Sequence, residues 1–127
     1  MKIILARHEI KNLIKKYYAN LGEKIDEVIV DYDYDEGFYG DRNYKVIGVV
    51  KRYIVIDNQR YYAQEEFDQN YIKEIIIEYF KVAKVEIQNI VFDIHIPYDQ
   101  RDCLEINANI YLKEKVRGRN YENDRKF

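Results

Sequence analysis

The chain has 127 residues and a formal net charge of -2, with 35% of its residues charged and 47% hydrophobic. This length suits one domain with a single core, and the apolar content excludes an intrinsically disordered chain. No apolar run approaches the ~20 residues of a membrane-spanning helix, and the single cysteine, Cys103, cannot form an internal disulfide. We therefore expect a soluble, cytoplasmic domain that does not enter a membrane.

The first half of the chain predicts a helix followed by two strands. Apolar residues spaced three or four apart form one helical stripe over Arg7–Asn20, and Gly22 can end that helix. Lys24–Asp35 changes to the two-residue period of a strand, and Tyr44–Ile56 is a second run rich in strand-forming residues. The glycine-containing segment between them predicts a hairpin loop.

The second half of the chain predicts the same three elements. Asp57–Arg60 has the composition of a turn, and a helix is expected from about Gln64 to Ala83. Two strands follow over Glu86–Ile96 and Cys103–Leu112, and Pro97–Asp102 joins them as a hairpin.

A shift of 62 residues superimposes the two halves without a gap. It places Ile10 on Ile72, Tyr17 on Tyr79 and Ile25 on Ile87. We therefore expect an α+β domain of two αββ units over residues 1–112, followed by a basic tail over residues 113–127. The two hairpins would form one antiparallel sheet with both helices on one face. Any two helix-hairpin units align in this way, so common ancestry stays open.

The predicted sheet has apolar residues on the side away from the helices. In the register of the repeat, these residues are Ile29, Ile47, Val49, Val91 and Tyr111. Exposed apolar patches usually mark contact surfaces, so this face predicts a homodimer or a partner docked on the sheet. The alternative is that the face is curled, or covered by the segment Tyr53–Ala63 and the tail.

The acidic tract Asp31–Glu36 is the most unusual feature of the chain. Strand alternation places its carboxylates on one face and its tyrosines on the other. Its spacing is similar to a calcium loop, but Glu36 and Arg42 replace the required glycine and glutamate, so a solvated acidic hairpin is favoured over calcium. A third interpretation is recognition of a protein with a basic surface. The candidate contact residues are Asp31, Tyr32, Asp33, Tyr34, Asp35, Glu36, Phe38 and Tyr39.

Two weaker candidates for a function remain. Asp93, His95 and Glu105 would lie together on one hairpin, which suggests a metal-dependent hydrolase, although a surface histidine beside a carboxylate is the simpler interpretation. The tail suggests weak nucleic-acid binding through its basic residues, which are Arg117, Arg119, Arg125 and Lys126. Common enzyme motifs are absent from the sequence, so we expect a non-enzymatic protein without a metal or cofactor.

The opening segment Glu9–Tyr18, followed by Val28–Tyr32, resembles the helix-then-strand start of small accessory proteins from phages and mobile elements of low-GC bacteria. The resemblance is one of type and carries no functional residue. It implies a protein that inhibits a bacterial defence system, such as an anti-CRISPR protein, in the cytoplasm of a bacterial or infected host cell.

Overall fold

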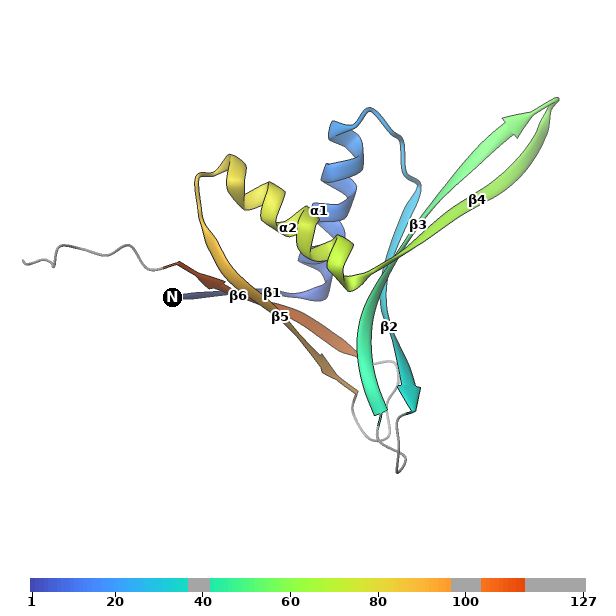
Figure 1. The fold of residues 1–127 in the computed structure, drawn as a ribbon. Coiled ribbons are helices and arrows are strands. Elements are labelled where there is room, and N and C mark those ends of the chain that lie inside the picture. Colours follow the sequence, from blue (N-terminus) through green and yellow to red (C-terminus); the bar gives the residue numbers. More distant parts are fainter. Residues whose placement is uncertain (37–41, 97–103, 114–127) are drawn as a thin grey trace, which may run out of the picture.

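The computed structural model describes residues 1–36, 42–96 and 104–113, and within them the chain forms two helices and six strands (Figure 1). In chain order the elements are β1 (Lys2–Leu5), α1 (Arg7–Asn20), β2 (Glu27–Glu36), β3 (Arg42–Ile56), β4 (Gln59–Asp68), α2 (Gln69–Val82), β5 (Ile87–His95) and β6 (Glu105–Leu112). The α+β class and the first helix are confirmed. Among the described residues, no helix has the length and apolar character needed to cross a membrane.

The strands form two antiparallel three-stranded sheets, in the orders β2-β3-β4 and β1-β6-β5. Figure 1 shows them crossing at an angle, with both helices lying in that angle. The prediction of one shared sheet is therefore wrong. Each hairpin instead gains a strand that the sequence did not predict, since β1 pairs with β6 and β4 pairs with β3, and among the described residues no strand of one sheet pairs with the other sheet.

The second helix begins later than the sequence pattern predicted. Residues 64–68 pair with β3 as the end of β4, and the helix starts only at Gln69. Asp68 fixes this start because its carboxylate accepts a hydrogen bond from the Tyr71 N–H at 3.1 Å. Helices α1 and α2 begin and end 62 residues apart, which is the offset of the predicted repeat. The last strands of the two predicted units differ in length, because β3 has 15 residues and β6 has 8.

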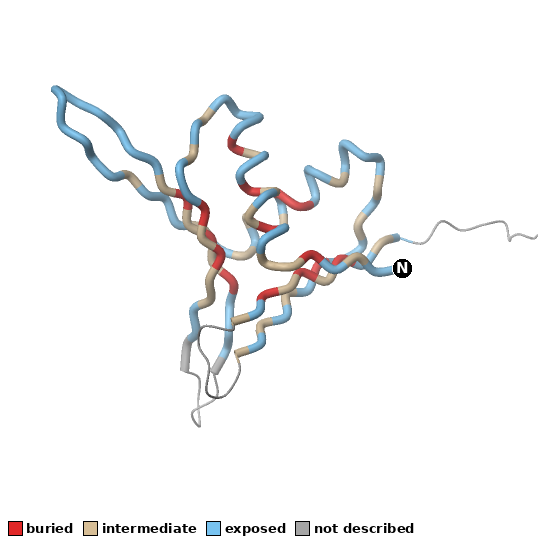
Figure 2. The backbone as a smooth tube through the Cα atoms, turned by 180° about the vertical axis from the view of Figure 1, so that it is seen from behind, coloured by how far each residue is buried: buried red, intermediate tan, exposed pale blue. Residues whose placement is uncertain are grey.

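The core lies where both helices cover the inner faces of the two sheets (Figure 2). The largest fully buried side chains come from both helices and both sheets: Ile10, Ile14, Ile72, Ile75, Ile76, Ile106, Ile110, Val30 and Val46. Each fully buried aliphatic side chain contributes about 1.5–3 kcal/mol relative to exposure, so this shared cluster holds the elements together.

An aromatic cluster connects the helices to the β2-β3-β4 sheet. Phe67 packs edge-on against Tyr71 with ring centroids 5.0 Å apart, and Tyr71 packs in the same way against Tyr17 at 6.1 Å. Gly48 allows this arrangement, because a Cβ at that position would overlap the ring of Phe67. Burial, together with the nearby Glu65 carboxylate, raises the pKa of Tyr18 above its ordinary value of 10.0. A hydrogen bond with Tyr17 also raises the pKa of Tyr71.

Candidate binding surface

The β3–β4 hairpin extends well beyond the helices, and residues 52–63 of this hairpin form what we call the arm (Figure 1). Figure 2 shows it as an exposed part of the chain, in which only Ala63 is half-buried. Six large apolar side chains of the arm are 38–68% exposed: Tyr53, Ile54, Val55, Ile56, Tyr61 and Tyr62. Exposed apolar side chains gathered on one projecting element mark a contact surface.

The arm folds as a ribbon because its turn and its pairs favour a hairpin. Asp57 and Asn58 have φ of 52° and 63°, the left-handed values that a two-residue hairpin turn needs at both positions. Tyr53 pairs with Tyr62 across the ribbon. At its base, the Asp26 carboxylate accepts a hydrogen bond from the Tyr53 N–H at 2.8 Å. A two-stranded ribbon is only marginally stable in water on its own, so cover by a partner would stabilise it.

The outer face of the β2-β3-β4 sheet is the side away from the helices, and its residues follow from the strand pairing. Listed from the arm tip, its rows are Val55 with Arg60, Tyr53 with Tyr62, Lys51 with Glu27 and Gln64, Val49 with Ile29 and Glu66, and Ile47 with Asp31 and Asp68. The arm end is therefore basic and aromatic, the middle row is charged and polar, and the other end combines aliphatic with acidic side chains.

The basic side chains of the outer face lie on tyrosine rings. The Arg60 guanidinium is 3.8 Å from the centre of the Tyr53 ring, and the Lys51 ammonium is 5.2 Å from that of Tyr62. The two rings pack edge-on, 5.4 Å apart. A hydrogen bond with the Tyr62 hydroxyl raises the pKa of Lys51 above its ordinary value. This arrangement presents flat aromatic surface and positive charge together.

The acidic tract is divided between the two faces of the sheet, as its alternation predicted. Asp31 and Asp33 lie on the outer face, where each carboxylate accepts a hydrogen bond from the next residue's N–H at 2.8 Å. Tyr32 and Tyr34 lie on the inner face, each 5.8 Å from the Tyr44 ring. The side chains of Asp35 and Glu36, and the residues Phe38 and Tyr39, lie outside the described part of the chain.

The inner-face tyrosines border an open hollow of about 460 Å³ between the two sheets. Arg7, Asp31, Asp33, Ile96 and Leu104 complete its lining. The Arg7 Nε donates a hydrogen bond to the Val30 carbonyl oxygen at 2.7 Å, which fixes this side chain at the start of α1. The lining thus combines tyrosine and aliphatic residues with one basic and two acidic residues, but the hollow is wide and open.

The predicted dimer face is not one surface. Ile29, Ile47 and Val49 are half-buried on the outer face of the β2-β3-β4 sheet, whereas Val91 and Tyr111 are exposed on the outer face of the other sheet. Because the chain forms two crossing sheets in place of one, these two groups face different directions. The segment Tyr53–Ala63, which was the alternative cover for this face, instead projects from the molecule as the arm.

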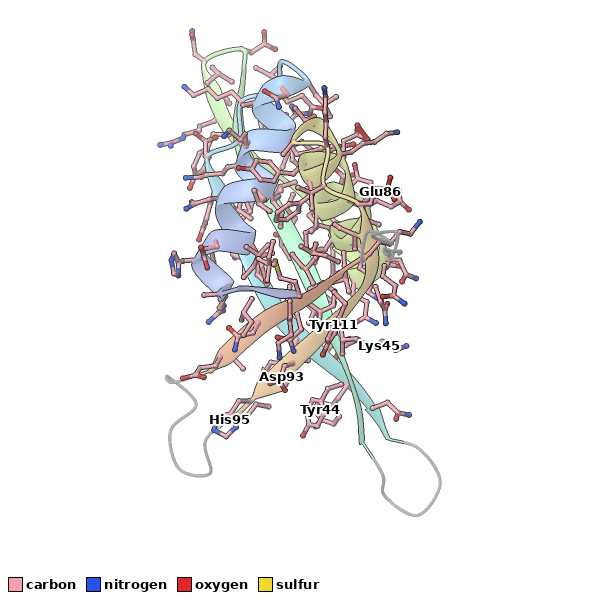
Figure 3. The ribbon with its side chains drawn as sticks, turned by 90° about the vertical axis from the view of Figure 1, so that its left-hand side faces the viewer. Tyr44, Lys45, Glu86, Asp93, His95 and Tyr111 are labelled. Atoms are coloured by element: carbon pink, nitrogen blue, oxygen red, sulfur yellow. The ribbon has the colours of Figure 1, made fainter. Side chains whose placement is uncertain are left out.

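Asp93 and His95 lie on β5 and are exposed (Figure 3). The pairing places His95 opposite Glu105 and Asp93 opposite Asn107, so Asp93, His95 and Glu105 lie on one hairpin, as the sequence predicted. Within residues 1–36, 42–96 and 104–113, no three His, Cys, Asp or Glu side chains gather as a metal site. Cys103 and the tail residues Arg117, Arg119, Arg125 and Lys126 lie outside the described residues.

An apolar groove of about 290 Å³ lies between the helices on their outer side. Its lining includes Leu13, Tyr17, Ile75, Tyr79 and Val82. The Lys16 ammonium lies 5.4 Å from the centre of the Tyr79 ring at this groove. The groove is small beside the arm, whose exposed apolar side chains extend along two strands.

Sequence reasoning missed the arm as a functional element. The sequence pattern predicts its first strand as the end of Tyr44–Ile56, but it predicts Asp57–Arg60 only as a turn between the two units. The available signal was the pair Asp57-Asn58, a two-residue turn sequence, followed by the strand-forming residues Tyr61 and Tyr62. The four consecutive apolar residues Tyr53–Ile56 place apolar side chains on both faces of the arm, so neither face is polar.

No family model matches the chain, and no curated protein or solved structure matches it either. The assignment of a function therefore rests on the chemistry of the binding surface itself.

Proposed function

We propose that this chain is a non-enzymatic protein-interaction module whose contact surface is the arm together with the outer face of the β2-β3-β4 sheet. The observation that carries the proposal is the exposure of six tyrosine, isoleucine and valine side chains on one projecting ribbon. Tyrosine supplies large, rigid contact area and is enriched among the residues that dominate binding energy.

The energy available from this surface is sufficient for specific binding. Covering about 300–400 Å² of apolar surface contributes roughly 7–10 kcal/mol before the costs of association. The two free edges of the ribbon add backbone donors and acceptors that a partner strand can pair with. Both contributions come from the arm and not from the helix-covered part of the sheet.

The acidic end of the outer face adds selectivity to this proposal. Asp31, Asp33 and Glu66 favour a partner with a basic surface, because opposite charges steer the encounter and like charges reject other proteins. The resemblance to phage accessory proteins makes a component of a bacterial defence system the first foreign partner to test.

Site-specific photo-crosslinking tests the proposal. A photoreactive phenylalanine analogue at Tyr62, on the outer face of the arm, is compared in living cells with the same analogue at Tyr111, which is exposed on the other sheet. We expect covalent protein adducts from position 62 at several times the yield from position 111. Equal yields, or no adduct from position 62, would refute the arm as the contact surface.

A further inference from the structure

We infer that the arm binds a second copy of this chain, lying antiparallel across the outer face of the other copy's β2-β3-β4 sheet. The inference rests on the proposed function and names the partner of that same surface. It follows from the order of side chains along the outer face, whose arm end is complementary to its acidic end.

Apolar side chains meet when two outer faces pack against each other with their strands in opposite directions and the two Lys51 rows aligned. In that arrangement Val55 of one copy lies over Ile47 of the other, and Tyr53 lies over Val49. Ile47 and Val49 are half-buried on a face that no other described element covers, and Val55 is 68% exposed. Contact would therefore cover apolar groups from both copies.

The charges match in the same arrangement. The Val55–Arg60 row of each arm lies over the row that contains Asp31 and Asp68, with Glu66 in the next row. Each arm thus brings its guanidinium to the acidic end of the other copy. In the middle row each strand lies over its own counterpart, so Lys51 faces Lys51, and each Lys51 lies beside Glu27 on the neighbouring strand of its own copy. A foreign partner would need the same sequence of charge and apolar rows, which a second copy has by construction.

The size and symmetry of this contact indicate a weak, closed dimer. The overlapping rows span about nine residues of β3, which is about 30 Å, and two or three strands of about 4.8 Å spacing. This is about 300–450 Å² of sheet face per copy, below the ≈ 800 Å² per partner of a stable complex, so association should depend on concentration. Since the same patch serves both copies, a two-fold axis closes the assembly at two.

The charges of the surface disfavour a nucleic acid as the main partner. The arm carries Arg52 and Arg60, but Arg52 is paired with the Glu23 carboxylate at 3.2 Å. The acidic rows on the same face repel phosphates. Aliphatic side chains on both faces of the ribbon suit a protein better than a nucleic-acid groove.

A charge exchange tests the inference on the full chain by sedimentation equilibrium over a range of concentrations. We expect a reversible dimer for the unmodified protein and a Kd about tenfold or more weaker for Arg60→Glu and for Asp31→Lys/Glu66→Lys. Mixing these two variants should restore the dimer, because in the mixed pair both arms meet a face of opposite charge. The matched control is Lys15→Glu on the exposed side of α1, which changes the net charge as Arg60→Glu does and should leave the Kd unchanged.

Three outcomes would overturn the inference. One is a monomer at every concentration, and another is a dimer that Arg60→Glu leaves intact. The third is a monomer that binds duplex DNA and loses that binding in Arg60→Glu, which would make the arm a nucleic-acid ribbon. If the protein is monomeric while position 62 crosslinks to a different protein, the proposed function stands and only the second copy is excluded as the partner.

Discussion

Strand β3 has a buried inner face near the helices and an exposed inner face in the arm. Near α1 and α2, the inner face of β3 buries Val46 and Val50 against the helices. Beyond the helices, Ile54 and Ile56 continue the same alternation on the same face and are exposed. The difference is in what covers the strand and not in its residues. Apolar alternation therefore stabilises the fold at one end and supplies a binding surface at the other.

The two regions should also differ in local stability. The part of β3 and β4 outside the arm, which we call the base, is held by the shared core of helices and sheets. The arm is held by its own cross-strand pairs and by a few contacts where it leaves the base, such as the Arg52–Glu23 ion pair. Regions with few buried contacts open at a lower free energy than the whole domain. Substitutions in the base should therefore change global stability, and substitutions in the arm should change binding.

The largest expected effect comes from a core isoleucine. Ile72→Ala removes a fully buried side chain from α2 and should lower the free energy of unfolding by about 2–5 kcal/mol, measured by urea denaturation. Ile54→Ala in the arm is the matched control and should change it by no more than about 0.5 kcal/mol. Similar losses in both variants would remove the distinction between base and arm.

A smaller loss is expected where β3 and β4 pack most closely. Gly48→Ala places a methyl group against the Phe67 ring and should cost about 1–3 kcal/mol of unfolding free energy. Adding Phe67→Leu makes room for that methyl group, so the double variant should lose less than the sum of the two single losses. Strict additivity in this cycle would show that the ring does not press on Gly48.

Substitutions at the N-terminal caps of the two helices should change the free energy of unfolding by about 1 kcal/mol. Asp68→Ala removes the side-chain cap of α2 and should destabilise the protein by about 0.5–2 kcal/mol. The matching position of α1 is Ala6, which makes no side-chain cap bond, so Ala6→Ser should stabilise the protein by a comparable or smaller amount. Thermal and urea unfolding of both variants measure these opposite signs.

The smallest effect is a dependence of stability on alkaline pH. Because the folded-state pKa of Tyr18 is raised, its contribution to stability is fully present below the ordinary pKa of 10.0 and falls as pH rises above it. Tyr18→Phe removes this titrating group, so stability of the variant should fall less steeply above pH 10 than that of the unmodified protein. Parallel curves would show that Tyr18 titrates alike in the folded and unfolded chains.

Local periodicity was enough to predict α1, the hairpins and the two faces of the acidic tract. It failed for the sheets, because β1 has only four residues and its pairing with β6 joins opposite ends of the chain. It also failed at Gln64–Asp68, where glutamine and glutamate favour a helix but pairing with β3 prevails. The arm was missed for a related reason: no sequence period tells a covered strand from one that extends beyond its helices.

Hydrogen exchange of the arm's backbone amides, measured at low and high protein concentration, tests the central claim most directly. We predict that amides of residues 53–62 exchange quickly in dilute protein and become protected as concentration rises, while the buried amides of Val46 and Val50 keep the same protection throughout. Arm amides that are as protected as the base at every concentration, or that stay unprotected in concentrated protein, would contradict an uncovered arm that a second copy covers.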